Sequence, residues 1–116
     1  ENLVKQIKAI VQPFMKEKVL AALWQVEGLP GITVSEVVGC GKRHTGEPDD
    51  RTAESGHVFV PKTKLEIFIA DGLLDVVIQT ITQAARTGQF GDGKVFVSDV
   101  LEAVKIRTGE RGADAI

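Results

Sequence analysis

The chain has 116 residues, of which 43% are hydrophobic and 26% charged, and its formal net charge is -2. These values indicate one globular domain over residues 1–116 with enough apolar side chain for a core, and they exclude a disordered chain. The slightly acidic balance excludes a general nucleic-acid binder, which needs clustered Lys and Arg.

No apolar run reaches the roughly 18 residues that a membrane-spanning helix needs. Residues 1–15 lack the charged-then-apolar order of a secretory signal. We therefore expect a cytoplasmic protein that does not insert directly into a membrane.

The first elements alternate between strand and helix. Residues 3–12 alternate apolar and polar side chains, which predicts a strand with Ile7, Ala9 and Val11 on one face. Helical spacing of apolar residues predicts a helix over residues 15–27, with Trp24 packed in the core or against another helix. Residues 32–41 alternate again and predict a second strand.

Residues 42–57 follow neither period and are rich in Gly, Pro and charged side chains. The segment is longer than the usual hairpin connection of about two to five residues. It predicts a long mobile loop, and such loops in compact domains often carry function.

The second half of the chain repeats the order of elements. Residues 58–70 predict a third strand, and Asp71 is expected to cap a second helix that ends at Thr87-Gly88. Residues 94–98 predict a fourth strand. One short helical turn is expected after Asp99, followed by an extended segment over residues 105–107.

The order βαββαβ predicts an α+β, ferredoxin-like sandwich. Its antiparallel sheet would carry two helices on one face, with the long loop between the second and third strands. The other face would expose Ile10 and Phe68, and an apolar sheet face left in water favours self-association.

Two segments suit the binding of phosphate groups. Gly91 and Gly93 flank Asp92 and allow backbone N–H groups to approach an anion, while Lys94 supplies a positive charge. Lys105 and Arg107 share one side of the predicted extended segment and could clamp a polyphosphate. The alternatives are an ordinary Gly-Asp-Gly turn and a solvated strand edge.

Four stretches together resemble the PII signal-transduction family: VQPF at 11–14, TVSEVVGCG at 33–41, TGQFGDGKVFV at 87–97 and IRTGERG at 106–112. The resemblance implies a homotrimer of ferredoxin-like subunits in which ATP and ADP compete for the clefts between subunits. It also implies that loop 42–57 controls a target protein, such as a transporter, an enzyme or an efflux component.

The resemblance also implies site residues. The phosphates would be held by Gly91, Asp92, Gly93, Lys94, Lys105 and Arg107. The phosphate end would be closed by Gly41, Lys42 and Lys62. The pocket for the base would be lined by Ile10, Thr33, Glu66 and Phe68.

The sequence departs from the family pattern at three positions. The family's uridylylated tyrosine aligns with Ser55, and the chain has no tyrosine, which rules out uridylylation. Arg43 replaces a glutamine that in the family helps to coordinate magnesium and 2-oxoglutarate, so a cation there disfavours both, although it could pair with a carboxylate or phosphate. Lys105 stands where arginine is common, which weakens the expected clamp.

Two other functions remain as alternatives. A metal-responsive trimer linked to heavy-metal efflux would use Cys40, His44 and His57, with Asp49 and Asp50 as oxygen ligands, although this spacing fits no standard metal site. A slow ATPase would need a base to orient water, and none is evident. The sequence thus favours a non-catalytic regulator and leaves open an additional ligand such as 2-oxoglutarate, bicarbonate or a metal.

Overall fold

The computed structural model describes residues 3–42 and 57–116. The strands are β1 (Val4–Val11), β2 (Ile32–Lys42), β3 (His57–Ala70) and β4 (Gly93–Asp99). The helices are α1 (Lys16–Leu23) and α2 (Leu74–Ala85), and the short 3-10 helices are η1 (Pro13–Met15), η2 (Asp71–Leu73) and η3 (Gly112–Ala115).

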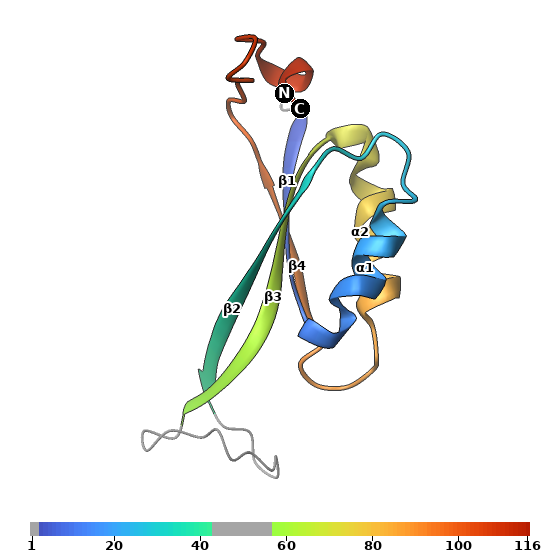
Figure 1. Cartoon of the computed structure of the whole chain (residues 1–116), viewed down its shortest axis with the longest axis vertical. Helices are drawn as coiled ribbons and strands as arrows, with labels where there is room; N and C mark the ends of the chain where they lie inside the picture. The colour runs from blue at the N-terminus through green and yellow to red at the C-terminus, as the bar shows by residue number, and fades with distance from the viewer. Residues whose placement is uncertain (1–2, 43–56) are drawn as a thin grey trace.

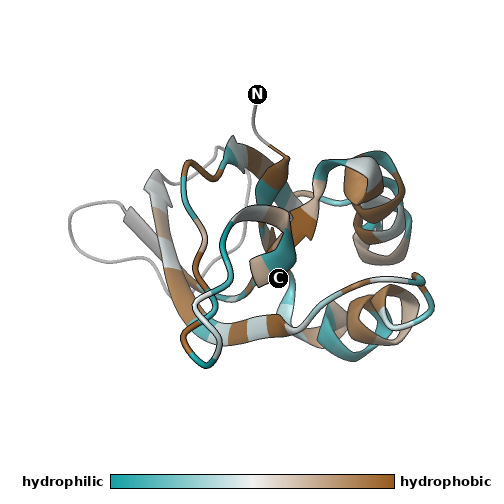
Figure 2. Cartoon of the chain, turned by 90° about the horizontal axis from the view of Figure 1, so that it is seen from above, coloured by the Kyte–Doolittle hydropathy of each residue, from teal (hydrophilic) through white to brown (hydrophobic). Residues whose placement is uncertain are grey.

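The strands form one sheet in the order β2-β3-β1-β4, and every neighbouring pair is antiparallel. Both helices cover the same face of this sheet (Figures 1 and 2). The predicted ferredoxin-like βαββαβ sandwich is therefore confirmed. None of the helices in the described ranges is both long enough and apolar enough to cross a membrane.

The core lies between the sheet and the two helices. The period-two pattern buries Ile7, Ala9 and Val11 of β1, as predicted. Buried residues of β3 share this face, and buried residues of both helices pack against it: Leu65, Ile67 and Ile69 of β3, and Val19, Leu23, Val77 and Ile81 of the helices. The two helices thus cover one face of the sheet and leave the other face exposed in this chain.

The structure corrects two helix predictions. Helix α1 ends at Leu23, so Trp24 falls on its C-cap and is 56% exposed rather than packed in the core. The chain turns back after it so that Val26 and Leu29 contact the core instead. Asp71 does not cap α2, because η2 starts at Asp71 and its N-cap is Ala70.

Strands β2 and β3 continue as a two-stranded ribbon beyond the end of β1. β1 pairs with β3 only from Ala70 to Thr63, whereas the β2–β3 pairing continues to Lys42 opposite His57. The predicted limits of the loop were therefore wrong by one residue at each end, since Lys42 and His57 are strand residues. Residues 43–56 lie outside the described residues.

The C-terminal segment also differs from its prediction. No helical turn lies between Asp99 and Lys105, and residues 106–108 form a turn rather than an extended segment. A small hairpin closes this turn: the N–H of Lys105 donates to the carbonyl of Glu110 at 2.8 Å, and Val104 pairs with Arg111. These local backbone bonds stabilise the turn, which hydrophobic periodicity cannot detect.

Candidate functional site

Several of the predicted site residues lie on one face of the sheet. Directly paired residues of antiparallel strands share a face, and Ile10 pairs with both Lys64 and Lys94. Thr33 pairs with Glu66. We call the face opposite the helices the open face; its residues on the strands include Gln6, Lys8, Ile10, Thr33, Lys62, Lys64, Glu66, Phe68, Lys94, Phe96 and Ser98.

The turn that leads into β4 is organised by Asp92. Its carboxylate accepts hydrogen bonds from the backbone N–H groups of Thr87 and Gly88, each at 2.8 Å, and from the Thr87 hydroxyl at 2.5 Å. The hydrogen bonds from Thr87 are the main cause that lowers the pKa of Asp92 below its ordinary value. These hydrogen bonds from Thr87 and Gly88 to the Asp92 carboxylate hold the two ends of the glycine turn together.

Two glycines of this turn have backbone conformations that other residues rarely adopt. Gly91 has φ +89° and Gly93 has φ +105°. A Cβ atom at Gly91 would lie 2.8 Å from Nε2 of Gln12 and 3.2 Å from Nζ of Lys62. The turn thus packs closely against the end of β1 and against β3.

Lys62 links the turn to the β2–β3 ribbon. Its Nζ donates a hydrogen bond to the Gly91 carbonyl at 2.5 Å. Partial burial lowers the pKa of Lys62, and the negative charge of Asp92 opposes this shift. The sequence pointed to Lys62 and Gly91 separately. It did not single out Gln12 as a site residue, although Gln12 belongs to the VQPF stretch at 11–14.

A second polar group lies farther along the open face. Nε2 of Gln6 donates to Oε2 of Glu66 at 3.2 Å, and the Ser98 hydroxyl donates to Oε1 of Gln6 at 3.2 Å. Lys64 forms an ion pair with Glu66 at 3.6 Å, and the Phe68 ring is 41% exposed on the same face. Neither Gln6 nor Ser98 was predicted, although the parity of β1 placed Gln6 on the face of Ile10.

The predicted phosphate residues do not meet within one chain. Gly93 pairs with Val11 at one end of β1, and Asp99 pairs with Lys5 at the other end. The seven residues of β4 span about 20 Å. The segment that follows β4, which includes Lys105 and Arg107, lies at the opposite end of the sheet from the turn that leads into β4 (Figure 1).

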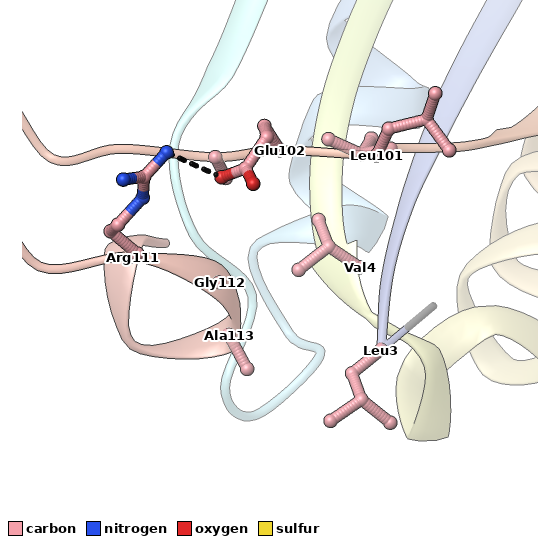
Figure 3. A pocket seen from close by; sticks show the side chains of 9 residues that line it. Leu3, Val4, Leu101, Glu102, Arg111, Gly112 and Ala113 are labelled. Atoms are coloured by element: carbon pink, nitrogen blue, oxygen red, sulfur yellow. Dashed lines mark hydrogen bonds and ion pairs between the residues drawn. The ribbon is translucent and has the colours of Figure 1, made fainter. Parts of the chain in front are cut away.

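Two open hollows lie away from the centre of the open face. One of about 410 Å³ lies between α2 and the β1–β4 pair, and its lining includes Ile10, Asp92 and Lys94. The other, of about 400 Å³, lies between the start of β1 and the C-terminal segment (Figure 3). There Nη2 of Arg111 donates to Oε1 of Glu102 at 3.0 Å, so the ion pair already satisfies the main charges of this hollow.

The described residues contain no cluster of side chains that would support a metal site. Over residues 3–42 and 57–116, no group of three His, Cys, Asp or Glu side chains could hold a metal ion. Cys40 is exposed. His44, Asp49 and Asp50 lie outside the described residues, as do Arg43 and Ser55.

Comparison with known proteins gives consistent matches over nearly the whole chain. The family model for nitrogen regulatory protein P-II matches residues 4–110. A nitrogen regulatory protein P-II from Rhodospirillum rubrum is 48% identical over 113 residues, which cover 97% of this chain and 100% of that protein. The protein of the same name from Bradyrhizobium diazoefficiens is 49% identical with the same coverage.

Solved structures agree with the sequence comparison. The B. subtilis GlnK-ATP complex has a TM-score of 0.82 and 28% identity, and the match covers 98% of this chain and 96% of that one. Arabidopsis thaliana PII bound to citrate has a TM-score of 0.79 and 37% identity, with coverage of 100% and 94%.

Proposed function

This chain belongs to the nitrogen regulatory protein P-II family, and from that premise we propose that it is a non-catalytic regulator that binds ATP or ADP. Bound nucleotide would control a target protein through residues 42–57. The observation that carries the proposal is the glycine turn at Gly91–Lys94, which lies against Lys62 beside the open face. ATP is the ligand of the similar GlnK structure.

The turn and the open face suit the two parts of a nucleotide. Gly91 and Gly93 have the positive φ angles that allow a turn to present backbone N–H groups to an anion, and Lys62 and Lys94 add positive charge. Farther along the face, Phe68 offers an aromatic surface beside the carboxylate of Glu66. A bound nucleotide would place its phosphates at the glycine turn and its base near Phe68.

We further propose that the functional form is a homotrimer. Lys105 and Arg107 lie at the opposite end of the sheet from the glycine turn, so they would reach a phosphate only in a neighbouring copy. Phe68 and Phe96 are 41% and 53% exposed on the open face, and oligomerisation would remove such apolar surface from water. Each nucleotide would then contact two subunits.

Nucleotide would act on the target by shifting a conformational equilibrium. Lys62 belongs to β3, which forms the ribbon that leads into residues 43–56. A phosphate that draws Lys62 away from Gly91 would change the base of that segment. ATP and ADP would have different effects only if they differ in affinity for the resulting states.

The decisive test is calorimetric titration with ATP, ADP and AMP, with and without magnesium and 2-oxoglutarate. We expect the wild type to bind adenine nucleotides and a Lys94→Ala/Arg107→Ala variant to lose most of this binding. Lys18→Ala, which removes an exposed charge from α1, is the matched control and should bind normally. Absence of binding by the wild type would refute the proposal.

Hydrogen exchange tests the regulatory step. We expect residues 42–57 to exchange at different rates in the ATP and ADP forms. Equal rates in the apo, ATP and ADP forms would contradict a nucleotide-controlled segment.

A further inference from the structure

The turn that follows β4 places a carboxylate beside Lys105. Oε1 of Glu110 lies 3.9 Å from Nζ of Lys105, and the same oxygen accepts a hydrogen bond from the Thr108 hydroxyl at 2.8 Å. The backbone N–H of Glu110 donates in turn to the Thr108 hydroxyl at 3.2 Å. Thr108 therefore holds the Glu110 carboxylate in place next to Lys105.

The backbone brings the same two residues together. The N–H of Lys105 donates to the carbonyl of Glu110 at 2.8 Å, and the N–H of Gly109 donates to the carbonyl of Lys105 at 2.7 Å. The pairing of Val104 with Arg111 closes the turn from outside. Lys105 and Glu110 thus lie opposite each other in a closed turn, so the fold of this segment sets the distance between the two charges.

The contact offsets part of the positive charge of the C-terminal segment. Lys105 and Arg107 are the two cations that the proposed nucleotide site would take from a neighbouring copy, and the Glu110 carboxylate cancels one of these charges. The side chains of Lys105 and Glu110 are 36% and 50% exposed. Both therefore reach solvent, and the pair can separate when another anion approaches.

A phosphate group and a carboxylate bind the same ammonium group by the same kind of charged hydrogen bond. We propose that Glu110 is an internal competitor of the nucleotide. It pairs with Lys105 in the empty site and lowers the affinity for phosphate groups, which must displace it. Glu110 is thus a positioning residue that acts through Lys105, and this inference rests on the proposed nucleotide-binding function.

The test measures ATP affinity by calorimetry in the wild type and in Glu110→Gln. Glutamine keeps the length of the side chain and can still accept from Thr108, but it carries no charge. We expect the variant to bind ATP about two- to fivefold more tightly, which is the range for the loss of one exposed ion pair. Glu102→Gln is the matched control, because Glu102 belongs to the same segment but pairs with Arg111 at 3.0 Å (Figure 3). It should leave the affinity close to that of the wild type.

Dependence on Lys105 separates competition from other effects. Glu110→Gln should give no gain of ATP affinity in a Lys105→Ala background, because the cation for which the two anions compete is absent. The gain should also shrink in about 1 M salt, which screens exposed charges. Unchanged or weaker binding by Glu110→Gln, an equal gain in Glu102→Gln, or a gain that persists without Lys105 or in high salt would overturn the inference. A wild type that does not bind ATP would instead refute the proposed function.

Discussion

Replacement of Gly93 by alanine tests how closely the glycine turn packs against β1. A Cβ atom at position 93 would lie 1.7 Å from the carbonyl oxygen of Ile10 and 2.8 Å from its carbonyl carbon. Both atoms belong to the backbone, so no side-chain rotation can relieve the overlap. The β1–β4 pairing must shift, and Lys94 must move with it.

The expected loss of stability has two parts. The φ angle of +105° costs alanine about 1–2 kcal/mol. Forcing an extra carbon against packed atoms costs about 1–3 kcal/mol or more. We therefore expect Gly93→Ala to lower the free energy of unfolding by about 2–5 kcal/mol.

Gly88→Ala is the matched control. Gly88 has a similar φ of +87°, but nothing lies within 4 Å of the Cβ position. Only the conformational cost of about 1–2 kcal/mol should remain. The difference between the two variants isolates the contact with Ile10.

The assay is urea unfolding followed by circular dichroism at one fixed protein concentration, because assembly makes stability depend on concentration. Trp24 fluorescence is a poor probe, since this residue is already 56% exposed in the folded chain. Equal destabilisation by Gly93→Ala and Gly88→Ala would refute the close packing of Gly93 on β1.

Three other outcomes are expected. Leu23→Ala should lower the free energy of unfolding by about 2–5 kcal/mol, because Leu23 is fully buried. Trp24→Ala should have a small effect, because Trp24 is exposed. Equal losses of stability in urea unfolding would place Trp24 in the core. The lowered pKa of Asp92 means that its ionised form stabilises the fold, so Asp92→Asn should reduce the urea midpoint at pH 7. The difference in urea midpoint between Asp92→Asn and the wild type should disappear as the pH falls below 3.8, the ordinary pKa of an aspartate, and then through the lower pKa of Asp92 in the folded chain. A difference that stays constant with pH would refute this. Lys62→Met should speed hydrogen exchange of residues 87–93 without any ligand, because it removes the bond to Gly91, and unchanged exchange would show that this bond does not hold the turn.

The strands and the core could be predicted from local pattern. Alternation of Ile7, Ala9 and Val11 reports directly which face of β1 is buried, because side chains of a strand alternate between faces. The ends of the elements were less predictable. Helix α1 stops at Leu23 because the following turns bring Val26 and Leu29 to the core, and this depends on contacts distant in sequence.

The candidate site was predicted as residue types but not as an arrangement. Motifs identified Gly91, Gly93 and Lys94 as suited to an anion, since small residues and a cation have that chemistry wherever they lie. The pairing of Lys62 with Gly91, and of Gln6 with Glu66, depends on strand register, which a linear pattern does not contain.

By itself the sequence determined the order of elements, the buried face of the sheet and the resemblance to the P-II family, because each follows from local periodicity or contiguous motifs. The tertiary structure alone decided that Asp92 shapes the glycine turn and that Gln6 holds Glu66. It alone separated Lys105 and Arg107 from Lys94 by the length of β4. These relations depend on distances in three dimensions, which neither residue type nor periodicity specifies.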